Sequence, residues 1–313
     1  HLHANQLIIG LCLVGDNLVS YDVDNIIKIY NVKKRVLKST IKPLSLNTNT
    51  NSSKDTITRI IHPPTHVNKI LIAYESGNLE LWNVKNKAMI YRFKSHLQIH
   101  SQRHKNKNIH DTPQTSASSC VLVVVENAPE VDIVGLGFED GTIMIMNIRL
   151  DLVLHVFKQH DGGVTSLSFR TDHKSVPQKV IVTSSTGGSI CMWPYKNQNK
   201  LLTNGIMTES SFNHNHNNVQ QQHYSEIKNA HLKSISKIYC LHGEPILISS
   251  SLDNSIKVWI FDMANGSARL LRSREGFVDH ISKVRSQRHF NYTSIQNATI
   301  LDEFELISMG DEK

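Results

Sequence analysis

The sequence predicts an all-β chain built from repeated four-stranded antiparallel sheets, and two observations lead to this prediction. A small or acidic turn, three or four alternating apolar residues and a large apolar anchor recur five times, with anchors at Tyr30, Trp82, Met146, Trp193 and Trp259. Other alternating runs rich in β-branched residues flank the copies, and Gly, Asn and Asp separate them. Alternation with a period of two, bounded by such residues, is typical of β-strands.

A turn residue stands six positions before each anchor. Three of the five are aspartates and the other two are small; in chain order they are Asp24, Ser76, Asp140, Gly187 and Asp253. Asp-Gly or Asp-Asn between two alternating runs favours a tight hairpin. An Asp side chain in a turn accepts hydrogen bonds from the backbone that follows it. We therefore interpret the recurring aspartates as structural rather than catalytic.

The anchors lie 52, 64, 47 and 66 residues apart, whereas a bare four-stranded repeat of this kind needs roughly 40–45 residues. Low-complexity stretches rich in His, Asn and Gln fall in the two longest intervals, and we expect residues 96–118 and 205–226 to be disordered loop inserts. The predicted repeats cover about residues 1–42, 55–95, 119–159, 160–204 and 230–274. A partial sixth repeat is expected over residues 279–313, as in a fragment of a longer protein.

The charge and cysteine content limit the possible functions. The chain carries a formal net charge of +7, which suits an acidic partner or nucleic acid, although a merely Lys-rich protein would look the same. The longest basic run is Lys33-Lys34-Arg35, so contact with nucleic acid would be diffuse.

The four cysteines lack CxxC spacing and lie in apolar runs, which indicates buried thiols in a reducing compartment. The N-terminal apolar run is too short to cross a membrane.

Motifs for catalysis or cofactor binding are missing from the sequence. It contains no nucleophile elbow, P-loop, zinc-protease helix or kinase signature. The glycines of GLGFEDG at 135–141 lie between two expected strands, which favours a hairpin over a phosphate-binding loop. The His-rich inserts lack Cys or carboxylate partners at fixed spacing. We therefore expect no enzyme activity, no cofactor, no metal and no small-molecule substrate.

The anchors, the Asp turns and a His near the start of some repeats resemble WD repeats, the four-stranded blades of a β-propeller. The fifth repeat is the most similar, with His231, Ser249 or Ser251, Asp253 and Trp259 matching the family's hydrogen-bonded set. In the fourth repeat His160 and Trp193 match. The resemblance implies five blades with part of a sixth, held by structural anchors at Asp24, Tyr30, Trp82, Asp140, Met146, His160, Trp193, His231, Ser249, Asp253 and Trp259.

The sequence around the repeats resembles a narrower group, the WD-repeat protein 36 family. The members of this family are tandem-propeller subunits of the small-subunit processome. Three pieces near the fifth repeat carry the likeness: GEP before the strand, DNSIKVWIFD across the anchor, and RLLRSREG in the outer strand. APEVDIVGLGFEDGTIMIMNIRLD at 128–151 fits as well, including its anchor Met146. The likeness runs in order over about residues 57–276. The two inserts and FVDHISKV depart from the family pattern.

This resemblance implies a non-catalytic nucleolar scaffold of ribosome biogenesis that helps to mature 18S rRNA. The implied partners are other WD-repeat subunits of the UTP-B module, with U3 small nucleolar RNA and pre-ribosomal RNA contacted directly or through partners. Basic residues near outer strands are candidate contacts, or charges that protect a strand edge: Lys33, Lys34, Arg35, Arg269, Arg272 and Arg274. The alternative is a general WD-repeat adaptor, such as a ubiquitin-ligase substrate receptor or a trafficking scaffold.

Overall fold

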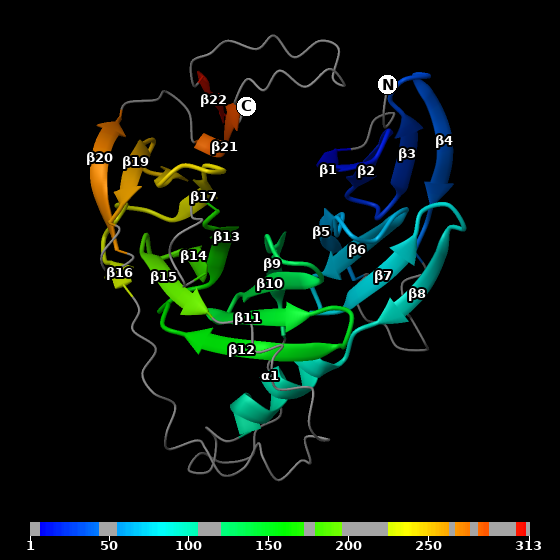
Figure 1. The fold of residues 1–313 in the computed structure, drawn as a ribbon, viewed down its shortest axis with the longest axis horizontal. Helices are drawn as coiled ribbons and strands as arrows, with labels where there is room; N and C mark the ends of the chain where they lie inside the picture. The colour runs from blue at the N-terminus through cyan, green and yellow to red at the C-terminus, as the bar shows by residue number, and fades with distance from the viewer. Residues whose placement is uncertain are drawn as a thin grey trace. The chain divides into compact units, whose positions relative to one another are not determined.

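The computed structural model describes residues 7–43, 55–105, 120–171, 179–195, 225–262, 267–275, 281–287 and 305–310. Within these ranges the chain forms five four-stranded antiparallel sheets, one two-stranded sheet and one helix (Figure 1). In every four-stranded sheet the strands follow one another in sequence order. The chain divides into two compact units, His1–Lys158 and Gln159–Lys313, which are described separately.

The first unit holds three meanders, called sheets 1, 2 and 3. Sheet 1 consists of β1 (Ile8–Val14), β2 (Asn17–Asp22), β3 (Ile27–Asn31) and β4 (Val36–Ile41). Sheet 2 consists of β5 (Ile57–Ile61), β6 (Lys69–Tyr74), β7 (Leu79–Asn83) and β8 (Ala88–Arg92). Sheet 3 consists of β9 (Leu122–Asn127), β10 (Ile133–Phe138), β11 (Thr142–Asn147) and β12 (Leu152–Lys158).

The second unit holds sheets 4 and 5 and the two-stranded sheet 6. Sheet 4 consists of β13 (Val164–Phe169), β14 (Lys179–Ser185), β15 (Ile190–Tyr195) and β16 (Ser225–Ile227). Sheet 5 consists of β17 (Ile235–Cys240), β18 (Ile246–Ser251), β19 (Ile256–Phe261) and β20 (Ala268–Arg274). In sheet 6, β21 (Ile281–Gln287) pairs antiparallel with β22 (Glu305–Gly310).

The first expected loop insert contains a helix. Residues Ser95–Lys105 form α1, so the expectation of a loop over 96–118 is wrong for its first part. Leu97 and Ile99 are the only aliphatic residues of the helix, and the side chains of His96 and His100 are buried. With histidines on the buried face, the helix shows no apolar periodicity in the sequence.

The outer strand of sheet 4 also departs from expectation. β16 follows the second insert and pairs with β15 through Ile190–Ile227, Cys191–Glu226 and Met192–Ser225. The expected end of this repeat at 204, and a loop insert reaching 226, are therefore wrong. Three residues are too few to show an alternating pattern, which explains the error.

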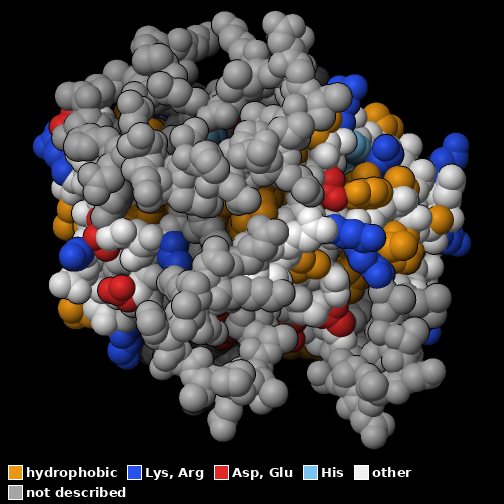
Figure 2. Space-filling model, turned by 90° about the horizontal axis from the view of Figure 1, so that it is seen from below, with side chains coloured by type: hydrophobic (Ala, Val, Ile, Leu, Met, Phe, Trp, Pro, Cys, Tyr) orange, Lys and Arg blue, Asp and Glu red, His pale blue; other side chains and the backbone are white. Residues whose placement is uncertain are grey.

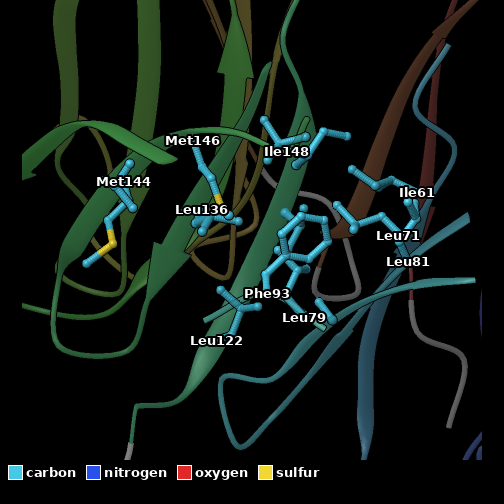
Figure 3. Packing of buried hydrophobic residues seen from close by; sticks show 14 of the residues in the cluster. Ile61, Leu71, Leu79, Leu81, Phe93, Leu122, Leu136, Met144, Met146 and Ile148 are labelled. Atoms are coloured by element: carbon cyan, nitrogen blue, oxygen red, sulfur yellow. The ribbon is translucent and has the colours of Figure 1, made fainter. Parts of the chain in front are cut away.

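The sheets of each unit stack face to face across apolar layers. Leu79 and Leu81 of sheet 2, and Phe93 just after β8, pack with Leu136 and Met146 of sheet 3 (Figure 3). β10 and β11 are buried on both faces along their whole length, which is typical of strands covered on both sides. Burial of this apolar area is the main source of stability of the stack.

The hairpin between the second and third strands has one backbone conformation in all five four-stranded sheets. The residue after the turn position has a left-handed φ of 61°, 86°, 80°, 77° and 61° in Asn25, Gly77, Gly141, Gly188 and Asn254. Its N–H donates to the carbonyl three residues earlier at 3.0–3.2 Å. Gly and Asn tolerate this conformation better than other residues, which accounts for the Asp-Asn and Asp-Gly pairs.

We expect Phe93→Ala to lower the free energy of unfolding by about 3–5 kcal/mol, because a large buried ring leaves a cavity and Phe93 is 1% exposed. Met89→Ala is the control nearby on β8, where the side chain is 45% exposed, and should change stability by less than about 0.5 kcal/mol. Urea denaturation followed by circular dichroism measures both. Equal losses in the two variants would contradict the assigned layer.

Candidate functional site

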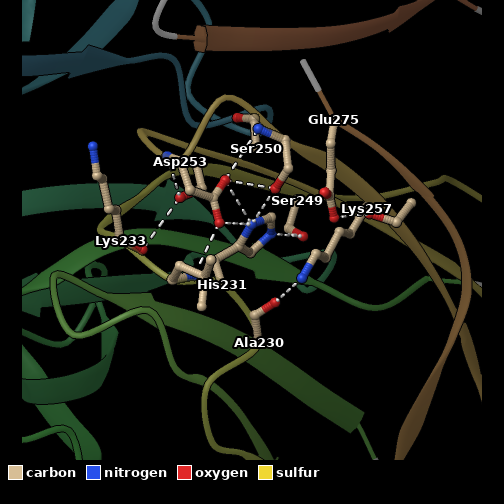
Figure 4. Close-up of polar contacts among 12 residues, drawn as sticks. Ala230, His231, Lys233, Ser249, Ser250, Asp253, Lys257 and Glu275 are labelled. Carbon is tan, nitrogen blue, oxygen red and sulfur yellow. Dashed lines mark hydrogen bonds and ion pairs between the residues drawn. The ribbon is translucent and has the colours of Figure 1, made fainter. Parts of the chain in front are cut away.

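Sheet 5 contains a hydrogen-bonded network that ties its hairpin to the loop before its first strand (Figure 4). His231, which is 2% exposed, places Nε2 2.7 Å from Ser249 Oγ and Nδ1 2.9 Å from Ser255 Oγ. The indole Nε1 of Trp259 donates to the same Ser249 Oγ at 2.8 Å. The network therefore joins the loop, β18 and β19 through one hydroxyl group.

Asp253 completes this network at the tip of the hairpin. Its carboxylate accepts the N–H groups of Leu232 at 2.9 Å and Ser255 at 3.0 Å, and lies 3.2 Å from Nδ1 of His231. Burial raises the pKa of Asp253, but hydrogen bonds from Ser255 and Leu232 outweigh it, and the net pKa is lowered. Burial lowers the pKa of His231 more than Asp253 raises it. The pair is thus a carboxylate facing a neutral imidazole.

Sheet 4 repeats this network without the carboxylate. His160 places Nε2 2.8 Å from Thr183 Oγ1 and Nδ1 2.9 Å from Ser189 Oγ. Trp193 donates to Thr183 Oγ1 at 2.9 Å. Gly187 stands at the Asp position, and Ser185 Oγ lies 2.9 Å from Ser189 Oγ instead. Burial lowers the pKa of His160 to about 4.

Cys191 lies beside this histidine, with its Sγ 3.7 Å from Nδ1 of His160. Burial raises the pKa of the Cys191 thiol to about 12. Nucleophilic cysteines act as thiolates, with a depressed pKa. At neutral pH this pair consists of a thiol and a neutral imidazole, so the geometry does not provide an activated nucleophile.

In sheet 3 the histidine comes from helix α1. Asp140 accepts the Thr142 N–H at 2.9 Å and the Lys158 ammonium at 2.9 Å, and His100 Nε2 lies 3.5 Å from Asp140 Oδ2. Burial raises the pKa of Asp140, but His100, Lys158 and Thr142 together hold it well below its usual range. One turn earlier on the helix, His96 Nε2 lies 2.8 Å from the carbonyl oxygen of Gly77. Helix α1 therefore contacts the hairpins of both sheets 2 and 3.

In sheet 2 the indole N–H of the anchor Trp82 donates to a carboxylate, whereas in sheets 4 and 5 the anchor donates to a hydroxyl group. The indole of Trp82 donates to Oε2 of Glu80 at 2.8 Å, and Tyr74 OH donates to the same oxygen at 3.0 Å. Arg92 donates to Oε1 through Nη2 at 2.6 Å and through Nε at 3.0 Å. The repeat pattern of the sequence does not mark Glu80, whose side chain is 5% exposed. The available signal was a Glu inside an apolar strand, with an Arg directly opposite on the next strand.

Sheet 1 uses a different acid from the expected one. Asp22, 1% exposed, accepts the N–H groups of Asp24 at 3.0 Å and Ile26 at 2.9 Å. In this hairpin Asp22, two residues before the expected Asp24, therefore accepts these N–H groups, and Asp24 lies exposed at the turn. The anchor Tyr30 is half-buried in this sheet, whereas Met146 is fully buried in sheet 3.

The candidate contact residues lie at two exposed places. Lys33, Lys34 and Arg35 form the turn between β3 and β4, where Lys33 Nζ lies 3.1 Å from Asp16. The arginines at 269, 272 and 274 lie on β20, the outer strand of sheet 5. On the face drawn in Figure 2, the described Lys and Arg side chains are scattered among apolar and acidic ones. The structure therefore separates the six candidates into two groups.

The described residues contain no group of three or more His, Cys, Asp or Glu side chains arranged to hold a metal ion. None of their helices is long and apolar enough to span a membrane. These residues instead contain hydrogen-bonded networks at the hairpins, in which His, Asp, Ser and Trp side chains bind one another and the backbone. Such networks hold strands and loops in place.

Ser249→Ala should lower the free energy of unfolding by about 2–4 kcal/mol, because it leaves two buried polar groups, on His231 and Trp259, without their partner. Ser273→Ala on the exposed outer strand β20 is the control and should have almost no effect. Urea denaturation followed by tryptophan fluorescence compares the two. Similar midpoints for the two variants would show that the network does not stabilise the sheet.

His160 makes stability depend on pH. Its folded pKa of about 4 lies below the ordinary 6.5, so the unfolded chain binds this proton at higher pH than the folded chain does. Stability is therefore lost as the pH falls from 6.5 towards 4, by about 2 kcal/mol at pH 5. His160→Gln should flatten the loss of stability between pH 7.5 and 5, measured by urea denaturation. An unchanged slope would contradict a neutral buried His160.

The comparisons with known proteins agree with this geometry. A family described as the WDR36/Utp21 first beta-propeller matches residues 2–262. WD repeat-containing protein 36 of Homo sapiens is 30% identical over 273 residues, which cover 87% of this chain and 24% of that protein. U3 small nucleolar RNA-associated protein 21 homolog of Schizosaccharomyces pombe is 30% identical over 254 residues, or 81% of this chain and 23% of that protein.

The chain therefore spans about a quarter of the length of these two relatives. A chain in the crystal structure of the mitotic checkpoint complex superposes with a TM-score of 0.60, covering 90% of this chain and 68% of that chain at 9% identity, which bears on the fold alone. The predicted all-β propeller fold and the suspected family are confirmed. With residues 2–262 matched, the chain belongs to the WDR36/Utp21 first β-propeller family.

Proposed function

We propose that this chain is part of a non-catalytic scaffold that assembles the small-subunit processome on pre-ribosomal RNA for 18S rRNA maturation. The observation that carries the proposal is the family match over residues 2–262, together with a relative described as associated with U3 small nucleolar RNA. Because the chain spans about a quarter of its relatives, the role of the whole protein is part of the proposal.

The chemistry of the sheets supports binding rather than catalysis. His231, Asp253 and Asp140 are the kinds of side chain that acid–base catalysis uses. Each of them instead joins a hairpin to a loop, a strand or a helix through several hydrogen bonds or ion pairs. Cys191 is held as a thiol, since its pKa is about 12. In a scaffold such internal contacts stabilise the fold, and the exposed side chains are the ones that bind partners.

The proposed partners are other WD-repeat subunits of the UTP-B module, U3 small nucleolar RNA and pre-ribosomal RNA, in the nucleolus. The chain's formal charge of +7 favours an environment rich in phosphate. The turn of Lys33, Lys34 and Arg35 is a candidate for direct RNA contact, because its three basic side chains are exposed. Contact through protein partners is the other route.

Affinity purification of the tagged full-length protein from cell extract tests this role. We expect U3 small nucleolar RNA and pre-ribosomal RNA to be enriched at least tenfold over a tagged, unrelated WD-repeat protein, along with other propeller subunits. Depletion of the protein should lower mature 18S rRNA relative to the large-subunit rRNA, because the scaffold acts before 18S is released. Quantitative RNA measurement follows both effects.

Two outcomes would contradict the proposal. Recovery of a cullin adaptor or of trafficking components without U3 RNA would point to a general WD-repeat adaptor. Normal 18S levels after depletion would remove the protein from ribosome assembly. An enzymatic activity in clean protein that one carboxylate substitution abolishes would overturn the non-catalytic part.

A further inference from the structure

Sheets 2 and 3 touch at the end opposite their hairpins, through the loops between their first and second strands. These loops cover residues 62–68 in sheet 2 and residues 128–132 in sheet 3. His66 Nε2 lies 2.9 Å from Asp132 Oδ1, and the hydroxyl group of Thr65 donates to the same oxygen at 2.8 Å. One carboxylate of the loop in sheet 3 thus holds two side chains of the loop in sheet 2.

Both loops end in the same backbone conformation. Asn68 and Asp132 have left-handed φ values of 57° and 60°. Their carbonyl oxygens accept the N–H groups of Val84 and Ile148, each at 2.8 Å. These hydrogen bonds tie each loop to the end of the third strand in its own sheet, so the two loops are equivalent and fixed in place.

A valine stands immediately before the left-handed residue in both loops. Val67 is 77% exposed and Val131 is 64% exposed. The corresponding position lies one residue before the carbonyl group that accepts this hydrogen bond, and in sheets 1 and 5 it holds Gly15 and Glu244. The turn itself therefore does not require an apolar residue here, and its geometry does not account for the two exposed valines.

Exposed basic side chains adjoin the two valines. Lys85 and Lys87 lie in the turn that follows Val84, and Arg149 lies in the turn that follows Ile148. Because Val84 and Ile148 are hydrogen-bonded to the two loops, both turns lie next to them. Positive charge therefore borders the valines in both sheets.

The acidic side chains of the same loops and turns are only partly exposed. Asp132 binds His66 of the neighbouring loop, and Glu130 is half-buried. Asp151 accepts the hydroxyl group of Tyr91 at 2.9 Å and the N–H group of Ser95 at 3.3 Å. Of the charged side chains in these described loops and turns, the exposed ones are therefore basic, which favours an acidic partner.

We propose that this end of sheets 2 and 3 binds a segment of a different protein, in which carboxylates flank aliphatic side chains. The binding surface, called the valine surface, consists of six exposed residues: Val67, Val131, Leu150, Lys85, Lys87 and Arg149. The aliphatic side chains of the partner cover the three apolar residues, and its carboxylates pair with the three basic ones. The hydrogen bonds between the loops fix this surface before the partner binds, which lowers the cost of binding. The valine surface does not depend on the proposed role in ribosome assembly.

The residues of the valine surface favour an acidic protein segment over RNA and over a second copy of this chain. Its centre is aliphatic, and the loops and turns that form it contain no Phe, Tyr or Trp. Single-stranded RNA binds best where its bases can stack on aromatic rings. A second copy of a chain with a formal net charge of +7 would bring further positive charge to a basic surface.

Photo-cross-linking in the full-length protein identifies the bound segment. A photoreactive phenylalanine derivative replaces Val67 in one variant. In the control variant it replaces Leu232, which is 89% exposed in the loop before β17. We expect position 67 to cross-link to a segment of a different protein that has at least two carboxylates beside aliphatic residues. Position 232 should not yield this segment, and nuclease treatment before irradiation should leave the cross-link from position 67 unchanged.

Co-purification of the cross-linked protein with unlabelled variants then tests both parts of the valine surface. Val67→Ser combined with Val131→Ser should lower its recovery about tenfold, because the apolar contact is lost. Lys85→Gln combined with Lys87→Gln should lower it about fivefold, because two charge pairs are lost. Quantitative mass spectrometry measures both effects.

Matched variants in the loop before β17 serve as controls. Leu232→Ser removes an exposed apolar group, and Lys228→Gln combined with Lys233→Gln removes two exposed charges. Each control should change recovery by less than about twofold. All variants should unfold in urea at the midpoint of the unaltered protein, because the substituted side chains are exposed.

Four results of the cross-linking would overturn the proposal. They are cross-links from position 67 to RNA alone, to another part of the same polypeptide, to a segment without carboxylates, or to nothing. Equal losses of recovery in the valine-surface variants and in their controls would also overturn it.

Discussion

The hairpin between the second and third strands makes the same demand in all five four-stranded sheets. Its backbone passes through a left-handed residue, and in sheets 1, 2, 3 and 5 an N–H group next to this residue donates to a side-chain oxygen. Buried N–H groups without a partner cost about 1–3 kcal/mol each, so a nearby oxygen must accept them. In sheets 1, 3 and 5 this oxygen belongs to Asp22, Asp140 and Asp253, and in sheet 2 it belongs to Asp55. In sheets 3 and 5 a histidine also lies beside the acceptor, His100 at Asp140 and His231 at Asp253.

The sheets differ in the side chain that pairs with the acceptor carboxylate. In sheet 5 it is His231, from the loop before the first strand. In sheet 3 it is His100, from a helix placed in the connection between two sheets, helped by Lys158. Helix α1 is thereby tied to the propeller: it gives one histidine to the hairpin of sheet 2 and one to that of sheet 3. Helix α1 thus lies in a segment of low-complexity sequence and still takes part in the polar contacts of the hairpins.

The sequence reveals the parts of this frame that have a fixed spacing. His231, Asp253 and Trp259 could be identified because each stands at a constant distance from strands with clear alternation. Glu80 and Asp22 could not, since each departs from the spacing and its role depends on which strand lies opposite. Helix α1 was missed because its buried face carries histidines, and β16 because three residues show no period. The roles of Glu80, helix α1 and β16 depend on contacts between residues far apart in the sequence, and a local sequence pattern does not show such contacts.

The division of polar groups between hairpins and outer strands also indicates where partners bind. At the hairpins of sheets 3 and 5, Asp140, His231 and Asp253 already form hydrogen bonds within the protein, so binding a partner through these groups would require breaking them. The outer strands differ, because they carry exposed apolar residues such as Leu270 and Leu271, each 49% exposed, beside exposed arginines. A partner that covers them buries apolar area and gains charged hydrogen bonds without disturbing the frame. The polar contacts of the hairpins therefore stabilise the sheets, and the outer strands present the exposed side chains to which a partner can bind.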